Sequence, residues 1–189
     1  CCCVPIAGII WDFDGVVVFT PHFEAWKRAC EDYGIRGFDE KFYDEYVSGL
    51  PRYEGAYNIL SMLGGSLFSH LTDEELKKKA VEFGDYKNEI FNKLIDAGAF
   101  KLNHEALKLL TEARRLGVLN VLASASRNAA RIAYMAKVEN LKLIELFDYD
   151  VSGSGQTKRE VFWNAYNYLR SRGAPHNCII VIEDSPKGA

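Results

Sequence analysis

The feature that most constrains the fold is a set of four short apolar runs, each of which ends in polar residues. They span residues 6–11, 118–123, 147–151 and 178–182, and the third is the weakest. Short apolar runs with polar ends are typical of strands buried on both faces. The first run is separated from the other three by about a hundred residues, so the sheet predicted here is interrupted early in the chain.

Helical patterns separate the last three runs. Apolar residues at spacings of three and four are Leu102, Ala106, Leu109, Ala113 and Leu116 in one stripe, and Val161, Ala165 and Tyr168 in another. The first stripe stops at Gly117 and the second before Gly173, and glycine is the residue that most often ends a helix. Strands that alternate with helices predict an α/β fold, a Rossmann-like parallel sheet with helices on both faces.

Residues 23–95 contain no convincing strand and read as helical. Phe23, Trp26, Cys30 and Tyr33 form a helical stripe that closes at Gly34. Thr72 with Glu75 forms a capping box, which predicts the start of a second helix. We therefore expect an all-helical cap domain at residues 21–97, inserted into an α/β core made of residues 1–20 and 98–189.

Composition narrows the class of protein. The 189 residues are 48% hydrophobic and 26% charged, and 23 basic against 26 acidic residues give a net charge of −3. This chain has no global basic field for nucleic acid or an anionic membrane, and its apolar runs are too short to span a bilayer. Five cysteines, three of them at Cys1–Cys3, do not make a secreted disulfide framework. We expect a cytoplasmic monomer and assign no function to residues 1–5.

Polar residues with complementary chemistry follow all four apolar runs. In chain order they are Asp12 and Asp14, then Ser124, then Lys158, and finally Glu183 with Asp184. The carboxyl ends of parallel strands meet at the edge of the sheet where ligands bind. Neighbouring carboxylates repel one another unless a cation such as Mg²⁺ is bound, and a hydroxyl and a lysine suit a phosphate group. Each residue alone is as readily a solvated turn, an N-cap or an exposed lysine, but the set predicts a site for Mg²⁺ and phosphate.

These segments resemble the four ordered motifs of the haloacid dehalogenase superfamily. The motifs read Asp-Phe-Asp-Gly-Val, Leu-Ala-Ser-Ala-Ser, a lone Lys, and Ile-Glu-Asp-Ser-Pro-Lys-Gly. The resemblance covers nearly the whole chain, and the helical insertion is similar to that family's cap. Segments 22–26, 49–52 and 124–128 are most similar to β-phosphoglucomutases and related sugar-phosphate phosphatases. Relatives continue through a further helix and strand, so we expect the core to be truncated at residue 189.

The resemblance implies a role for each residue of the core. Asp12 would be the nucleophile that forms an aspartyl-phosphate, and Asp14 the general acid and base. Ser124, Ala125 and Lys158 would bind the transferring phosphoryl group. Asp12, the backbone carbonyl of Asp14, Glu183 and Asp184 would hold Mg²⁺.

Three residues of the insertion bear on the substrate. Lys87 falls on an apolar helical stripe, where it either extends its ammonium to solvent or faces an anion. Arg52, in an expected loop, is either a solvated arginine or a clamp for a second phosphate. His22 stands where mutases of this group also have a histidine.

The motifs are compatible with two enzymatic functions and can be compared with two other classes of phosphate-binding protein. A Mg²⁺-dependent phosphatase of small phosphorylated metabolites, such as sugar phosphates, is narrowly favoured because phosphatases are the more prevalent. A β-phosphoglucomutase is the alternative, supported by Arg52, Lys87 and His22. A signalling receiver domain does not fit, because its acceptor Asp ends the third strand and no helical block interrupts it. A nucleotide-binding P-loop at residues 153–158 lacks the required Gly-Lys-Ser/Thr sequence.

Overall fold

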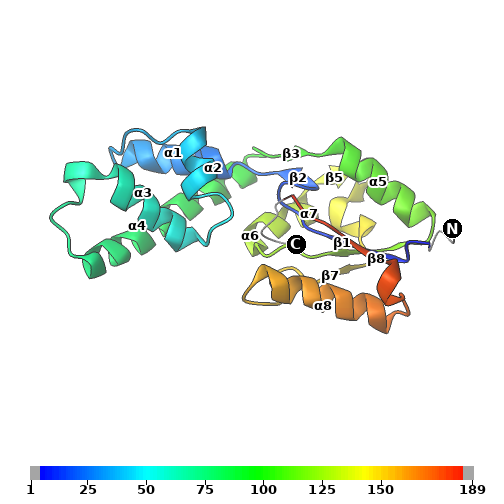
Figure 1. Ribbon diagram of the computed structural model, residues 1–189. Helices are drawn as coiled ribbons and strands as arrows, with labels where there is room; N and C mark the ends of the chain where they lie inside the picture. The colour runs from blue at the N-terminus through cyan, green and yellow to red at the C-terminus, as the bar shows by residue number, and fades with distance from the viewer. Residues whose placement is uncertain (1–4, 185–189) are drawn as a thin grey trace. The chain divides into compact units, whose positions relative to one another are not determined.

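The computed structural model describes residues 5–184, and the chain divides into two compact units (Figure 1). The core unit comprises Cys1–Thr20 and Phe100–Ala189, and the inserted unit comprises Pro21–Ala99. The insertion thus ends two residues beyond the sequence-based bound of 97. Cys1–Cys3 and the part of the fourth motif that follows Asp184 lie outside the described residues.

The core unit is built on a four-stranded parallel sheet with the order β7-β4-β1-β8. The strands are β1 (Gly8–Trp11), β4 (Leu119–Leu122), β7 (Tyr149–Asp150) and β8 (Ile179–Ile182). In the register, Ile10 pairs with Val121 of β4 and Val181 of β8. The sequence prediction of a Rossmann-like parallel sheet from four apolar runs is confirmed.

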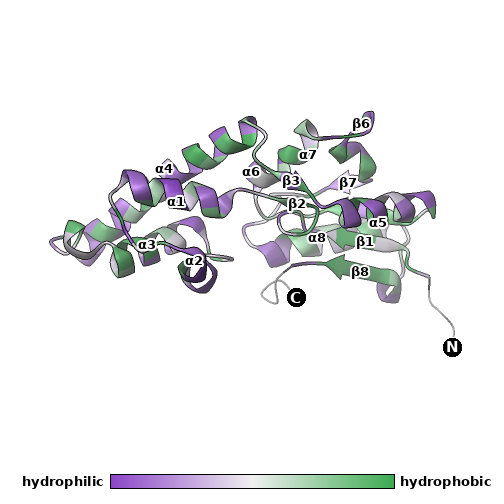
Figure 2. Ribbon diagram, turned by 90° about the horizontal axis from the view of Figure 1, so that it is seen from above, coloured by the Kyte–Doolittle hydropathy of each residue, from purple (hydrophilic) through white to green (hydrophobic). Residues whose placement is uncertain are grey.

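Helices α5 (His104–Arg115) and α8 (Lys158–Ser171) cover opposite faces of this sheet (Figure 1). Alternate strand residues point to alternate faces, so Ile10 packs in one cluster with apolar residues of α8. The next residue, Trp11, is fully buried, and its indole Nε1–H donates to Oδ1 of the buried Asn120 at 2.9 Å. In Figure 2, β8 is coloured as hydrophobic, whereas helices α5 and α8 contain both hydrophilic and hydrophobic residues.

Two short strands lie where the chain leaves and re-enters the core unit. They are β2 (Val18–Phe19) and β3 (Lys101–Leu102), which pair antiparallel, with Val18 opposite Leu102. The side-chain amide of Asn103 adds a 2.8 Å hydrogen bond to the carbonyl of Val16. The core unit is completed by α6 (Arg127–Ala130), α7 (Ile132–Met135), β5 (Lys137–Val138) and β6 (Leu141–Lys142), with 3₁₀ turns Leu143–Leu146 and His176–Cys178.

The inserted unit is helical, and residues 21–99, all of them described, contain no strand. Its helices are α1 (His22–Asp32), α2 (Glu40–Tyr46), α3 (Arg52–Leu63) and α4 (Asp73–Asp96), with a 3₁₀ turn at Gly65–Leu67. The capping box at the start of α4 is present: Thr72 Oγ1 accepts from the Glu75 amide, and Glu75 Oε2 accepts from the Thr72 amide. Trp26 and Phe83 pack together in its core.

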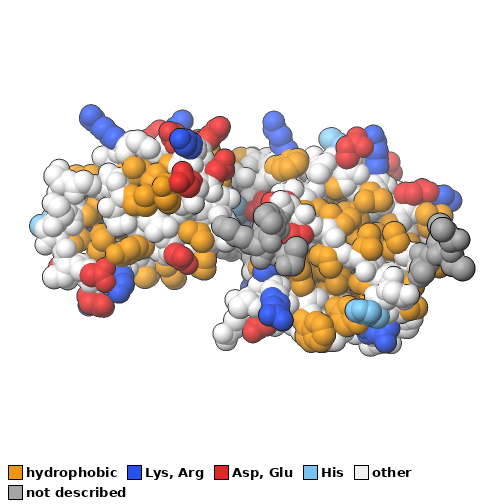
Figure 3. All heavy atoms as spheres, viewed as in Figure 1, with side chains coloured by type: hydrophobic (Ala, Val, Ile, Leu, Met, Phe, Trp, Pro, Cys, Tyr) orange, Lys and Arg blue, Asp and Glu red, His pale blue; other side chains and the backbone are white. Residues whose placement is uncertain are grey.

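Charged side chains of both signs are interspersed on the face shown in Figure 3, as the small net charge leads one to expect. Among the described residues, none of the helices has the length and apolar character needed to cross a membrane.

Candidate active site

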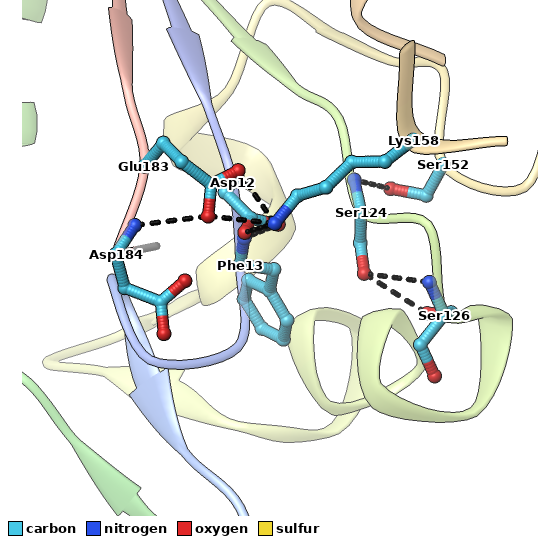
Figure 4. Close-up of polar contacts among 8 residues, drawn as sticks. All are labelled: Asp12, Phe13, Ser124, Ser126, Ser152, Lys158, Glu183 and Asp184. Atoms are coloured by element: carbon cyan, nitrogen blue, oxygen red, sulfur yellow. Dashed lines mark hydrogen bonds and ion pairs between the residues drawn. The ribbon is translucent and has the colours of Figure 1, made fainter. Parts of the chain in front are cut away.

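Side chains from separate parts of the core unit meet at the carboxyl end of its sheet (Figure 4). Asp12 directly follows β1, Glu183 and Asp184 directly follow β8, and Lys158 is the first residue of α8. Parallel strands with one direction bring these ends to one edge. The convergence of the first, third and fourth motifs on one point is therefore a consequence of the strand order.

Lys158 is the centre of the charged contacts. Its Nζ lies 2.8 Å from Oδ2 of Asp12, and 2.6 Å and 2.5 Å from the two carboxylate oxygens of Glu183. The Asp12 and Glu183 side chains are only 6% and 7% exposed, whereas that of Lys158 is 30% exposed. The ammonium partly neutralises two buried carboxylates and keeps one side open to solvent.

The Asp12 carboxylate is oriented by a second contact. Its Oδ1 accepts a 2.8 Å hydrogen bond from the Phe13 amide. Burial raises the pKa of Asp12 from 3.8 to about 6, against the opposing effect of Lys158. Burial also raises the pKa of Asp184 to about 6, with Glu183 adding to the shift. Burial lowers the pKa of Lys158, but the hydrogen bonds and charges of Asp12 and Glu183 together outweigh it and raise the pKa overall.

Three carboxylates are arranged as metal ligands. One oxygen each of Asp12, Glu183 and Asp184 lies within 4.8 Å of the others. One ammonium does not balance three carboxylates, so excess negative charge is concentrated here. Hard oxygen donors at this spacing, with excess negative charge, fit Mg²⁺.

Asp14 has a different environment from Asp12. Its Oδ2 accepts a 2.7 Å hydrogen bond from the hydroxyl of Thr20, and its side chain lies outside the three-carboxylate cluster. Between the two acids and β2 the chain turns at Gly15, which has φ +81°. A Cβ atom on Gly15 would lie 2.7 Å from Cγ of Asp184, so the missing side chain leaves room for that carboxylate.

Ser124 follows β4 in a tight loop. Its Oγ donates to the carbonyl of Ser126 at 3.0 Å and accepts from the Ser126 amide at 3.2 Å. Ser124 is 1% exposed, whereas its neighbour Ala125 is exposed. The helix that follows this loop, α6, begins at Arg127 and is four residues long. A helix this short adds little dipole, so any anion affinity of the loop depends on local groups.

In the inserted unit, Lys87 and His22 form a pair. Lys87 is 4% exposed, so its ammonium does not extend to solvent, and its Nζ lies 2.9 Å from Nδ1 of His22. The ammonium is 4.9 Å from the ring centre of Trp26 and 4.8 Å from that of Phe91. The His22 ring stacks on Phe91 with centroids 4.2 Å apart. Aromatic faces stabilise this buried cation.

Arg52 is not in a loop, as the sequence suggested, but is the first residue of α3. Gly49 and Pro51 precede Arg52 and are typical of a loop. Proline is also common at the start of a helix, and here Pro51 is the N-cap of α3. The Arg52 guanidinium lies 3.4 Å from the Asp85 carboxylate.

Two residues with clear contacts to site groups carry no distinctive pattern in the sequence. Thr20 is six residues from Asp14, and Ser152, whose hydroxyl accepts from the Ser124 amide, is 28 residues from Ser124. Gly15 could have been found, because a glycine next to paired acids often marks a left-handed turn.

Comparisons with known proteins agree with this architecture. The family model for haloacid dehalogenase-like hydrolases matches residues 6–189. An archaeal β-phosphoglucomutase from Pyrococcus sp. strain ST 04 is 47% identical, with a TM-score of 0.85 over 96% of this chain and 79% of that one. A β-phosphoglucomutase from Clostridium difficile is 26% identical, with a TM-score of 0.66 over 97% and 78%.

A more distant neighbour shares the fold alone. CbbY from Rhodobacter sphaeroides, solved in complex with phosphate, is 23% identical, with a TM-score of 0.67 over 97% of this chain and 80% of that one. With a family model that matches nearly every residue and a relative 47% identical over most of both chains, this protein belongs to the haloacid dehalogenase-like hydrolase family and is an enzyme of that type.

Proposed function

We propose that this enzyme transfers phosphoryl groups of small phosphorylated sugars through an aspartyl-phosphate on Asp12, with Mg²⁺ as cofactor. The observation that carries the proposal is the buried Asp12 carboxylate, held by Lys158 beside Glu183 at the carboxyl end of the sheet. A carboxylate fixed by an ammonium and a backbone amide is oriented for attack on an electrophile.

The reaction proceeds in two transfers that share one proton carrier. A carboxylate oxygen of Asp12 forms a bond to phosphorus as the bond from phosphorus to the sugar oxygen breaks. The carboxyl of Asp14 donates its proton to that leaving oxygen. In the second half, Asp14 takes the proton from an incoming hydroxyl, whose oxygen attacks phosphorus and releases the Asp12 carboxylate. The Thr20 hydroxyl donates to Oδ2 of Asp14 at 2.7 Å and orients the carboxyl that would carry the proton.

Ser124, Ala125 and Lys158 bind the transferring phosphoryl group. The Ser124 hydroxyl hydrogen turns from the Ser126 carbonyl toward a phosphate oxygen, and the exposed Ala125 offers its amide. Lys158 supplies a positive charge at the phosphoryl oxygens, where negative charge must be stabilised during transfer.

The carboxylates of Asp12, Glu183 and Asp184, with the backbone carbonyl of Asp14, are the residues that would hold Mg²⁺. When bound, Mg²⁺ neutralises charge on the phosphoryl oxygens and lowers the repulsion between phosphate and the Asp12 carboxylate. Both Glu183 oxygens contact Lys158, so Glu183 would share its carboxylate between that ammonium and the metal.

Mg²⁺ should stabilise the protein above about pH 6 and lose that effect below it. Asp12 and Asp184 have pKa values raised to about 6, so in metal-free protein their contribution favours folding at acid pH and is lost as pH rises through 6. Mg²⁺ needs both carboxylates ionised, and a hundredfold excess over Kd adds about 2.7 kcal/mol to the free energy of unfolding. Unfolding temperatures with and without Mg²⁺, at about pH 5 and about pH 7.5, test this.

The matched control for that titration is Asp184→Asn, which should remove the Mg²⁺-dependent increase at the higher pH. An increase of the same size at both pH values would contradict the assignment of these carboxyls as ligands.

A sugar hydroxyl is the better supported final acceptor, which makes the enzyme a β-phosphoglucomutase. The 47% sequence identity to an archaeal β-phosphoglucomutase supports this choice over the phosphatase that the sequence narrowly favours. Hydrolysis, with water as the acceptor, remains the second candidate because it uses the same nucleophile, acid and metal.

The inserted unit contributes the residues that select the substrate. Lys87, with His22, binds oxygens of the sugar phosphate, and Arg52 binds a second phosphate through its guanidinium. The Lys87–His22 contact holds both groups in fixed positions before substrate arrives, which lowers the entropy lost on binding.

The acceptor can be measured directly. With Mg²⁺ and glucose 1,6-bisphosphate, we expect conversion of β-glucose 1-phosphate to glucose 6-phosphate to exceed release of inorganic phosphate by about a hundredfold, since a bound sugar hydroxyl has a large advantage over water. Coupled detection of glucose 6-phosphate and malachite-green detection of phosphate, on one preparation, give the two rates.

Lys87→Ala, measured in the same assay, should raise KM. Because the buried Lys87 side chain packs on Trp26 and Phe91, its removal should also lower the unfolding temperature. Phosphate release from a panel of metabolites without any isomerisation would replace the mutase with the phosphatase. Neither activity with Mg²⁺ present would contradict the proposed function.

A further inference from the structure

Both main-chain polar groups of Ser124 are bonded to one neighbouring loop. Its amide donates to the hydroxyl oxygen of Ser152 at 3.0 Å, and its carbonyl accepts from the amide of Gly153 at 2.9 Å. Figure 4 shows the first of these contacts, with Ser152 on the loop that leads from β7 to Lys158. The loop after β4 and the loop after β7 are thereby fixed to one another at the serine.

Ser152 is in turn held in place by Asp150. Its amide donates to Oδ1 of Asp150 at 2.8 Å, and the phenol of Tyr134 donates to Oδ2 of the same carboxylate at 2.6 Å. The hydrogen bond to Asp150 raises the pKa of Tyr134 to about 12, so the phenol remains a donor at neutral pH. A chain of three hydrogen bonds therefore runs from half-exposed Tyr134 to buried Ser124.

A third contact joins the same two loops. The Arg127 guanidinium donates to the carbonyl of Gly153 at 2.8 Å. Gly153 has φ +68°, and an added Cβ would lie 2.9 Å from Cδ of Arg127. The positive φ of Gly153 favours glycine, and the Arg127 contact joins the loop after β7 to the start of α6.

We propose that Ser152, supported by Asp150 and Tyr134, is a positioning residue that sets Ser124 for binding the transferring phosphoryl group. This inference rests on the proposed role of Ser124. Because Ser124 is 1% exposed, its amide reaches no water if the Ser152 hydroxyl is removed. A buried N–H without an acceptor is unfavourable, so the loop moves to satisfy it and carries the Ser124 hydroxyl with it.

The test measures the inhibition constant of inorganic phosphate, with thermal unfolding as a parallel measurement of stability. Ser152→Ala should raise that constant about tenfold. Ser152→Thr keeps a hydroxyl and should restore most of the affinity. Ser154→Ala is the matched control from the same loop, because the Ser154 hydroxyl accepts a hydrogen bond from the Asn164 side chain. This variant should leave the inhibition constant of phosphate unchanged.

Ser124→Ala distinguishes the phosphate-binding role of Ser124 from the positioning role of Ser152. If Ser124→Ala weakens phosphate binding and Ser152→Ala does not, the positioning role is wrong and the proposed function stands. If Ser124→Ala itself leaves phosphate binding unchanged, the phosphate-binding role of Ser124 fails. If Ser152→Ala lowers the unfolding temperature but leaves the inhibition constant of phosphate unchanged, and Ser152→Thr restores no affinity, then Ser152 has only a structural role. That result also overturns the inference.

Discussion

Asp12→Asn should reduce turnover by about 10⁴-fold or more, because an amide cannot form the acyl-phosphate on which both proposed half-reactions depend. The substitution keeps the size and shape of the side chain. Its Oδ1 can still accept from the Phe13 amide, and Lys158 retains its contacts with Glu183. Steady-state turnover of β-glucose 1-phosphate, and covalent labelling by phosphate donors, measure the effect.

The same variant should not be less stable at neutral pH. Burial raises the pKa of Asp12 to about 6, which means that folding at pH 7 carries the cost of an ionised buried carboxyl. The neutral amide removes that cost, which offsets the lost ion pair and the contact of its Nδ2 donor with the Lys158 ammonium. We therefore expect the unfolding temperature to stay close to that of the wild type. Substantial residual turnover would contradict the assignment of Asp12 as nucleophile. Early unfolding would contradict the expected effect on stability.

Gly15→Ala should weaken Mg²⁺ binding strongly, although the residue has no side chain to serve as a ligand. The backbone at Gly15 has φ +81°, where an L-residue costs about 1–2 kcal/mol. The new methyl group would also lie 2.7 Å from Cγ of Asp184, closer than carbon atoms approach. The Asp184 carboxylate must move, and the Mg²⁺ concentration for half-maximal activity should rise about 10- to 100-fold.

Gly34→Ala separates backbone strain from displacement of the carboxylate. Gly34 has φ +71°, and nothing lies within 4 Å of an added Cβ. This control should lose a similar amount of stability and keep its Mg²⁺ dependence. If the two variants responded to Mg²⁺ alike, crowding of Asp184 by residue 15 would be the wrong explanation.

The sheet and the convergence of its strand ends could be predicted because each rests on a local pattern. A run of four apolar residues followed by Asp12 or Glu183 indicates both a buried strand and the end of that strand. The parallel order then brings those ends together without further information. Helices α1, α5 and α8 can likewise be predicted from apolar residues at spacings of three and four over several turns, and α4 from its capping box.

The remaining features depend on contacts between distant residues or on segments too short to show a period. The two-residue strands β2 and β3 have no measurable alternation. The burial of Lys87 follows from its pairing with His22, 65 residues away. Arg52 was assigned to a loop because Gly49 and Pro51 precede it, yet proline is equally suited to the first turn of a helix.

The pairing of β2 with β3 has a consequence for how such enzymes diversify. The chain leaves the core unit just after β2 and returns just before β3, and Val18 of β2 lies opposite Leu102 of β3. A different segment can replace the inserted unit if its two ends lie as close together as the paired strands β2 and β3. The same nucleophile and metal ligands can therefore be combined with new recognition modules, and exchanging residues 21–99 for a foreign helical segment is a practical route to altered specificity.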